Sequence, residues 1–131
     1  MRLALWQGPS PASDLDAACA GAEAALHSAA AIGAAALVLP EVWLPGYNQP
    51  DMPARALSRD SAPLQRLASA AKTTRTALVA GYAERDGDRI YNAGACFGPE
   101  GTMLAHHRKI QLYGPRESAI YTPGDTYTTF H

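Results

Sequence analysis

The sequence predicts a layered α/β domain in which helices cover one face of a sheet, and two observations carry this prediction. Apolar runs at residues 3–7 and 35–40 enclose an alanine-rich segment with helical spacing, which gives a β-α-β beginning. From residue 76 onward, apolar runs alternate with turn sequences and predict three more strands. A chain of 131 residues is the size of one ordinary domain.

The first half of the chain supplies the β-α-β unit. The first strand stops at the proline-rich loop of residues 8–11 (GPSP). Ser13 lies three residues before Asp16, which is typical of a helix N-cap. Gly33 marks the expected end of this helix. Residues 35–40 contain no polar side chain, so we expect a parallel strand covered on both faces. The buried side of the helix is expected to carry Leu15, Cys19, Ala22, Leu26 and Ala29.

The second half supplies one helix and the remaining strands. Residues 44–47 (LPGY) suit a type II turn, and residues 48–60 are polar enough to predict a loop. A helix is expected to begin near Ser61. Residues after 110 are rich in turn formers. Leu64, Leu67, Ala68 and Ala71 form the expected buried side of this helix, and the strands are expected at 76–83, 90–97 and 102–110, with turns at 86–87 and 98–101.

Composition and charge narrow the classes of function. A chain with 47% hydrophobic residues, 18% charged residues and a net charge of −1 is globular, and it has no basic field to hold nucleic acid or an anionic membrane. No apolar run reaches the ~20 residues of a membrane span. Two distant cysteines predict neither a disulfide framework nor a zinc site, so we expect a cytoplasmic protein whose partner is a small molecule or another protein.

Two charged residues follow strands and are candidates for chemistry. Glu41 comes directly after the buried run, where open α/β sheets place ligand sites and where partial desolvation suits a general base. Lys109 lies at the end of the last predicted strand. Each could equally be an ordinary solvated residue. If brought within ~4 Å, however, the two would interact by about 4 kcal/mol at an effective dielectric constant of about 20. Such a pair would keep a base ionised and offer positive charge to an oxyanion.

Three motifs in order give these residues a context. Residues 39–47 (LPEVWLPGY) resemble the glutamate motif of the carbon–nitrogen hydrolase (nitrilase-like) superfamily, and residues 107–114 (HRKIQLYG) resemble its lysine motif. Glu117 and residues 121–125 (YTPGD) follow as in amidase-type members. The resemblance runs through nearly the whole chain, including residues 91–93 (YNA) and the turn at 98–101.

The resemblance implies a fold and a set of roles. The family fold is an α-β-β-α sandwich, of which this chain is expected to be the N-terminal half, and it pairs with a second subunit. Glu41 would be the general base that takes a proton from a cysteine thiol, Lys109 would stabilise the oxyanion, and Glu117 would position the substrate and the catalytic groups. The family uses no metal or organic cofactor. The expected substrate is a small amide, with nitriles and N-carbamoyl compounds as alternatives.

The chain departs from the family at its nucleophile. The family's cysteine follows the Pro-Gly-Asp motif, and residues 1–131 end before reaching it. We therefore expect a partial domain, truncated before the nucleophile and inactive alone. The alternative is a non-catalytic form that acts only as an association partner through an uncovered sheet face. A nucleotide-binding domain is a third class, but the sequence has no glycine-rich phosphate loop after its first strand.

Other nucleophiles and metal ligands are less well supported by the sequence. Residues 94–98 (GACFG) spell the pattern of a nucleophile elbow around Cys96, but that motif needs a following helix, and a strand is predicted instead. Cys19 and Cys96 are both expected to be core residues. His106 and His107 are neighbours on a strand and point to opposite faces, so they cannot share one metal ion. We expect His106 only to pack.

Overall fold

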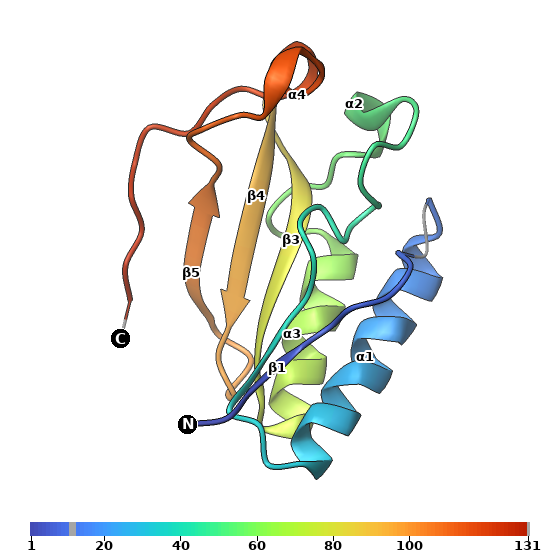
Figure 1. Ribbon diagram of the computed structural model, residues 1–131, viewed down its shortest axis with the longest axis vertical. Coiled ribbons are helices and arrows are strands. Elements are labelled where there is room, and N and C mark those ends of the chain that lie inside the picture. Colours follow the sequence, from blue (N-terminus) through green and yellow to red (C-terminus); the bar gives the residue numbers. More distant parts are fainter. Residues whose placement is uncertain (11–12, 131) are drawn as a thin grey trace.

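The computed structural model describes residues 1–10 and 13–130 as one sheet with two long helices packed on one face (Figure 1). Helices α2 and α4 are short and lie together at one end of the sheet (Figure 1). The predicted layered α/β class is therefore confirmed. The elements are β1 (Leu3–Leu5), α1 (Leu15–Ala31), β2 (Ala36–Val38), α2 (Met52–Arg55), α3 (Ala62–Thr74), β3 (Ala77–Asp86), β4 (Arg89–Phe97), β5 (Met103–Arg108) and α4 (Gly114–Ile120).

The strands lie in the sheet in the order of the sequence, from β1 to β5. Strands β1, β2 and β3 are parallel, because α1 and α3 provide the crossovers between them. Strands β3, β4 and β5 form an antiparallel meander, with Gly87 at φ 57° in the first turn. The chain after α4 runs back beside β5 (Figure 1), where the Thr128 hydroxyl donates to the carbonyl of His106.

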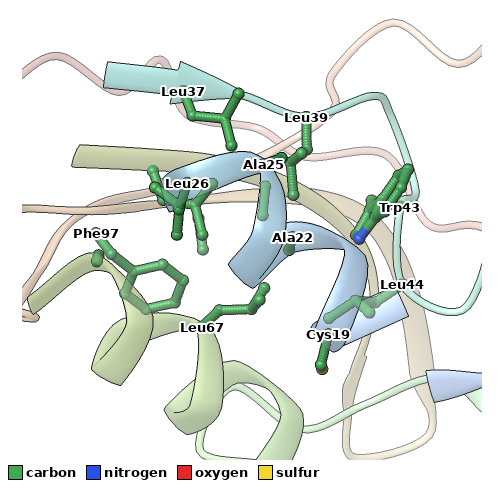
Figure 2. Close-up of a cluster of buried hydrophobic side chains, with 14 of the residues drawn as sticks. Cys19, Ala22, Ala25, Leu26, Leu37, Leu39, Trp43, Leu44, Leu67 and Phe97 are labelled. Carbon is green, nitrogen blue, oxygen red and sulfur yellow. The ribbon is translucent and has the colours of Figure 1, made fainter. Parts of the chain in front are cut away.

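The main core lies between the sheet and helices α1 and α3 (Figure 2). Small residues on α1, such as Ala22 and Ala25, allow the helix to lie close to the sheet, and larger side chains fill the remaining space. The predicted buried side of α3 is confirmed at Leu64, Leu67 and Ala71, whereas Ala68 is only half-buried.

The first helix begins differently from the sequence prediction. Its N-cap is Asp14, whose carboxylate accepts from the backbone N–H of Ala17 at 2.9 Å. The predicted cap, Ser13, has φ 70° and donates its hydroxyl to Gln49 instead. The end of the helix is as predicted, with Gly33 at φ 68° just beyond it. Pro11 of the predicted loop lies outside the described residues.

Two segments predicted to be irregular contain short helices. Residues 48–60 include α2, with Met52 buried, and the turn-rich C-terminal segment includes α4, with Glu117 buried. Both helices have proline in the first turn, where its fixed φ favours the start of a helix. The sequence prediction takes these prolines as signs of a loop. None of the helices in the described part of the chain is long and apolar enough to cross a membrane.

The second face of the sheet is covered by described residues only at the end where α2 lies, where Ala83 and Ile90 pack with Val42, Met52 and Tyr121. The rest of this face is called the uncovered face. Side chains alternate along each strand, so Leu5 and Val38 point away from the core that their neighbours Ala4 and Leu37 enter. Leu5 is 67% exposed. The expectation that residues 35–40 are covered on both faces is therefore wrong for this chain, because α1 and α3 occupy the same side (Figure 1).

Candidate functional site

The position of Glu41 is set by a glycine on the neighbouring strand. After β2 the chain crosses over β3, and a Cβ atom at Gly81 would lie 2.5 Å from the backbone N of Val42 and 2.7 Å from the carbonyl O of Pro40. Only glycine permits this approach. Leu44 N–H then donates to the carbonyl of Gly81 at 3.2 Å, which fixes the segment that carries Glu41.

Lys109 follows β5 and is fixed by backbone bonds on both sides. Its N–H donates to the carbonyl of Asn92 on β4 at 2.7 Å, and its carbonyl accepts from Gly124 N–H at 2.9 Å. A Cβ at Gly124 would lie 2.3 Å from the carbonyl O of Arg108, so glycine is required here as well. The motif at residues 121–125 therefore packs against the end of β5, next to Lys109.

The three candidate residues meet at one end of the sheet. Lys109 Nζ lies 2.6 Å from Glu41 Oε1, and it lies 3.2 Å from Oε1 and 3.1 Å from Oε2 of Glu117. Asn92 Nδ2 donates to the same Glu41 Oε1 at 2.7 Å, and the Tyr47 hydroxyl donates to Glu117 Oε1 at 3.0 Å. We call these five residues the Lys109 cluster.

Glu117 is the buried carboxylate of this cluster. Its Oε2 accepts from the backbone N–H of Tyr113 at 2.7 Å, at the start of α4. Burial raises the pKa of Glu117, but the hydrogen bonds from Tyr113, Lys109 and Tyr47 together lower it by more. The pKa therefore lies below the ordinary glutamate value. The same contact raises the pKa of Tyr47, because its hydroxyl donates to an ionised carboxylate. Glu117 is therefore an ionised anchor.

Lys109 is the cation of the cluster. Burial lowers the pKa of Lys109, but its hydrogen bonds to Glu41 and Glu117 raise it by more, so the pKa lies above the ordinary lysine value. The ammonium group thus remains charged at neutral pH.

Glu41 is more exposed than the sequence predicts. Of its side chain, 45% is exposed, so the expected desolvation of this residue is small in the described chain. The residue lies at the rim of a groove on the uncovered face of the sheet, and no described element covers it from that side.

The groove has a volume of about 260 Å³. Gly81 and Gly94 are paired across β3 and β4 and form its floor, because they carry no side chains. His107 pairs with Gly94 and borders the groove beside Lys109. The groove is large enough for a small molecule, and its charged end is the Lys109 cluster.

A second ion cluster lies on the helix side of the sheet. The carboxylate of Glu84 is buried and lies within 3.1 Å of Arg59, Arg108 and His106. Arg108 also pairs with Asp86 at 2.7 Å. We call these five residues the Glu84 cluster. Burial raises the pKa of Glu84, but these hydrogen bonds lower it well below the ordinary value. The expectation that His106 only packs is wrong, because it contacts Glu84 and the Tyr82 hydroxyl.

The cysteines are structural in this chain. Cys19 and Cys96 are both buried, and burial raises the pKa of each thiol, which disfavours the reactive thiolate. Cys96 lies on β4, which leads through a turn into β5 rather than into a helix, so the elbow geometry is absent. Of the described residues that line the groove, none is a cysteine, and residues 1–10 and 13–130 contain no cluster able to hold a metal.

The structure thus brings together Glu41, Lys109 and Glu117 and adds two residues to which the sequence assigned no role. Asn92 belongs to the motif at residues 91–93, and Tyr47 ends the motif at residues 39–47. Their contacts depend on strands and loops that are far apart in sequence. Chemically, the cluster pairs a partly exposed carboxylate, able to accept a proton, with an ammonium group able to stabilise negative charge.

Comparison with protein families gives one match across the chain. The sequence model of a family described as "Carbon-nitrogen hydrolase" matches residues 2–131. A protein from Pseudomonas protegens, "Hydrolase in pqqF 5'region", is 37% identical over 130 residues, which is 95% of this chain and 44% of that protein. Human "Omega-amidase NIT2" is 34% identical over 114 residues, which is 80% of this chain and 41% of that protein. The chain spans less than half the length of these two relatives.

The fold is similar to that of solved amidase structures. An amidase from Nesterenkonia sp. superposes with a TM-score of 0.86 and 29% sequence identity. The match covers 96% of this chain and 49% of the amidase chain. The architecture is that of the N-terminal half of the nitrilase-like fold.

Proposed function

This chain belongs to the carbon-nitrogen hydrolase family, and we propose that it provides the base and the oxyanion-stabilising cation for hydrolysis of a small, non-peptide amide. One observation carries the proposal: a single ammonium group, Lys109 Nζ, lies between two carboxylates beside an open groove. The omega-amidase relatives and the amidase structures favour an amide over a nitrile or an N-carbamoyl compound.

The proposed roles follow from the position of each group. Glu41 takes the proton of a cysteine thiol, and the sulfur attacks the carbonyl carbon of the amide. The carbonyl oxygen becomes an oxyanion, which Lys109 stabilises through its positive charge. The tetrahedral intermediate collapses as the amine leaves with the proton from Glu41, and water then hydrolyses the thioester. Glu117, fixed by Tyr113 and Tyr47, holds Lys109 and orients the substrate amide.

We propose that the nucleophile comes from a segment beyond residues 1–131, and that these residues alone do not hydrolyse amides. Both cysteines of this chain are buried, and neither lines the groove. The E41Q mutant of the Nesterenkonia amidase shows covalent addition of the acetamide moiety of fluoroacetamide at its active-site cysteine, which supports a cysteine nucleophile for the proposed reaction. The proposed reaction uses no metal or organic cofactor, and a reducing cytoplasm would keep the thiol free.

A chimera tests this function directly. Residues 1–130 would be joined to the half of the Nesterenkonia amidase that they do not cover, and ammonia release from butyramide, a ligand of that amidase, would be measured. We expect activity, a loss of about 10²–10⁴-fold for Glu41→Gln, and a loss of about 10²–10³-fold for Lys109→Ala. Lys72→Ala is the matched control, because Lys72 is the chain's other lysine and lies on α3.

The controls make the outcome decisive. A chimera that folds and melts cooperatively but releases no ammonia would refute the proposed function, as would full activity in Glu41→Gln. Reading the source DNA beyond the codon for His131 is the complementary test. A frame that continues into a strand with a cysteine supports the proposed nucleophile, and a stop codon contradicts it.

The uncovered face of the sheet favours a second candidate function, in which the chain acts as an association partner. Leu5 and Val38 present apolar surface there, and a sheet normally buries such a face against another layer. We propose that this chain forms dimer-based homo-oligomers. Light scattering tests the proposal: oligomers or poor solubility are expected, and a clean monomer with a cooperative melt would count against it.

A further inference from the structure

Asn92 connects the two charged residues of the groove. Its backbone carbonyl accepts the N–H of Lys109 at 2.7 Å, and its side-chain amide donates to Glu41 Oε1 at 2.7 Å. The residue lies within β4, pairs with Ala83 on β3, and is only 4% exposed. A single rigid strand position therefore holds both the strand end that carries Lys109 and the carboxylate of Glu41.

The carboxylate of Glu41 needs such support. Nearly half of its side chain is exposed, so the residue could rotate away from Lys109 into solvent at little cost in desolvation. The salt bridge to a flexible lysine fixes a distance but not an orientation. The buried amide of Asn92 adds a second donor from a fixed direction, and two donors on one oxygen define the plane of the carboxylate.

We propose that Asn92 is the positioning residue of this site. It keeps Glu41 Oε1 hydrogen-bonded to Lys109 and to Asn92, and it leaves Oε2 as the oxygen that accepts the proton. Within the described residues, both hydrogen bonds to Glu41 end on Oε1. This inference rests on the proposed function only in naming Glu41 as the base. In the proposed step the S–H bond of the thiol breaks, its electron pair stays on sulfur, and an O–H bond forms at Oε2.

Asparagine suits this position better than residues of the same size. Aspartate would place a second negative charge beside Glu41, and leucine would fill the space without a donor. Asn92→Leu therefore removes the hydrogen bond to Glu41 while the backbone carbonyl that holds Lys109 is kept.

The test measures the ammonium group of Lys109 in this chain. The sequence has two lysines, so ¹⁵N-lysine labelling gives two side-chain signals, with Lys72 as the internal reference. We expect Glu41→Gln to lower the pKa of Lys109, because an ionised hydrogen-bond partner is lost. Asn92→Leu should produce more than half of that shift, because Glu41 then rotates away. Asn92→Leu should add no further shift in the Glu41→Gln background.

Each outcome decides the role of Asn92. An unchanged Lys109 titration in Asn92→Leu, or the same shift in both backgrounds, would overturn the proposal and leave Asn92 as a packing residue. If Asn92→Leu fails to fold, a comparison of two chains that keep Asn92, the wild type and Glu41→Ala, still gives an answer. The two asparagines of the sequence provide two side-chain amide pairs by selective labelling, with Asn48 as the control. Glu41→Ala should move the Asn92 pair alone, and an unmoved pair overturns the proposal.

The result is separate from that of the hydrolysis assay. None of these signals requires turnover, so an inactive chimera would refute the proposed function without changing the measured coupling between Asn92 and Glu41. In an active chimera, Asn92→Leu should lower kcat at least ~10-fold with KM within about twofold, because Asn92 acts on the base rather than on substrate binding. A change in KM with kcat unchanged would contradict the role.

Discussion

Arg108 and Lys109 are neighbours in sequence, yet they enter ion clusters on opposite faces of the sheet. Arg108 points to the helix side, where it meets Glu84 and its guanidinium lies 3.7 Å above the ring of Tyr91. Lys109 points to the uncovered side and meets Glu41. Neighbouring side chains alternate between the two faces of a sheet, which separates Arg108 from Lys109. The two clusters therefore lie on opposite faces at the same end of β5.

The clusters differ in how completely their carboxylates are bonded. Glu84 is about 2% exposed, and four contacts occupy its oxygens: Arg59 and Arg108 on Oε1, and Arg108 and His106 on Oε2. Around Lys109 the balance is reversed, because two carboxylates share one ammonium group and Glu41 is partly exposed. A buried carboxylate with all its lone pairs used stabilises structure, whereas Glu41 Oε2 has no hydrogen-bond partner among the described residues, as the proposed proton transfer requires.

The largest effect on stability is expected at Glu84. Glu84→Gln removes the charge that pairs with Arg59 and Arg108 in a buried setting, which should lower the free energy of unfolding by about 3 kcal/mol, the lower end of the usual range because both arginines reach solvent. Urea unfolding measures this. Glu23→Gln is the matched control, since Glu23 also forms a two-pronged bond with an arginine but at the surface, and should cost about 1 kcal/mol or less.

Glu41→Gln sharpens the same comparison from the other cluster. It should cost less than Glu84→Gln, because Glu41 is partly exposed and Lys109 retains Glu117. Equal losses for Glu41→Gln and Glu84→Gln would show that the two clusters do not differ in kind.

A smaller effect is expected from the glycines under the groove. Gly81→Ala drives a Cβ into the backbone at Pro40 and Val42, so it should cost about 1–3 kcal/mol and displace Glu41. Gly94→Ala, on the paired strand position, meets nothing within 4 Å and should leave stability within about 0.5 kcal/mol. Urea unfolding of both variants tests this, and equal losses would contradict the role given to Gly81.

The strands and long helices were predictable because their signals are local. Apolar runs predicted β2 and β4 within one or two residues, and the spacing of Leu64, Leu67 and Ala71 predicted the buried side of α3. The short helices α2 and α4 were missed because they contribute few apolar residues and begin at prolines. The cap at Asp14 was missed because Ser13 is drawn away by Gln49, a contact across 36 residues.

The candidate site was predictable only in part, for the same reason. Glu41 and Lys109 each follow a strand, and the resemblance added Glu117, so these three could be named before their contacts were known. The hydrogen bond between Asn92 and Glu41 depends on the register of β4 against β3 and on the crossing over Gly81, which no local pattern encodes. The Glu84 cluster likewise depends on the registers of β3 and β5 against β4 and on the position of the loop that carries Arg59.

The smallest effect is expected from acid titration of Glu117. Its pKa in the folded chain lies below the ordinary value of about 4.3, because the hydrogen bonds from Tyr113, Lys109 and Tyr47 outweigh burial. Its contribution to stability is therefore complete above the ordinary value and is lost as pH falls through the lowered folded pKa. The stability gap between the wild-type chain and Glu117→Gln should then narrow from about pH 7 to about pH 3. Urea unfolding across this range measures the gap. Glu84 titrates in the same direction, but it is present in both proteins and cancels from the difference. A gap that stays constant across this range would mean that Glu117 acts through the shape of its hydrogen bonds alone, and the charge of the Lys109 cluster would then play no part in holding it together.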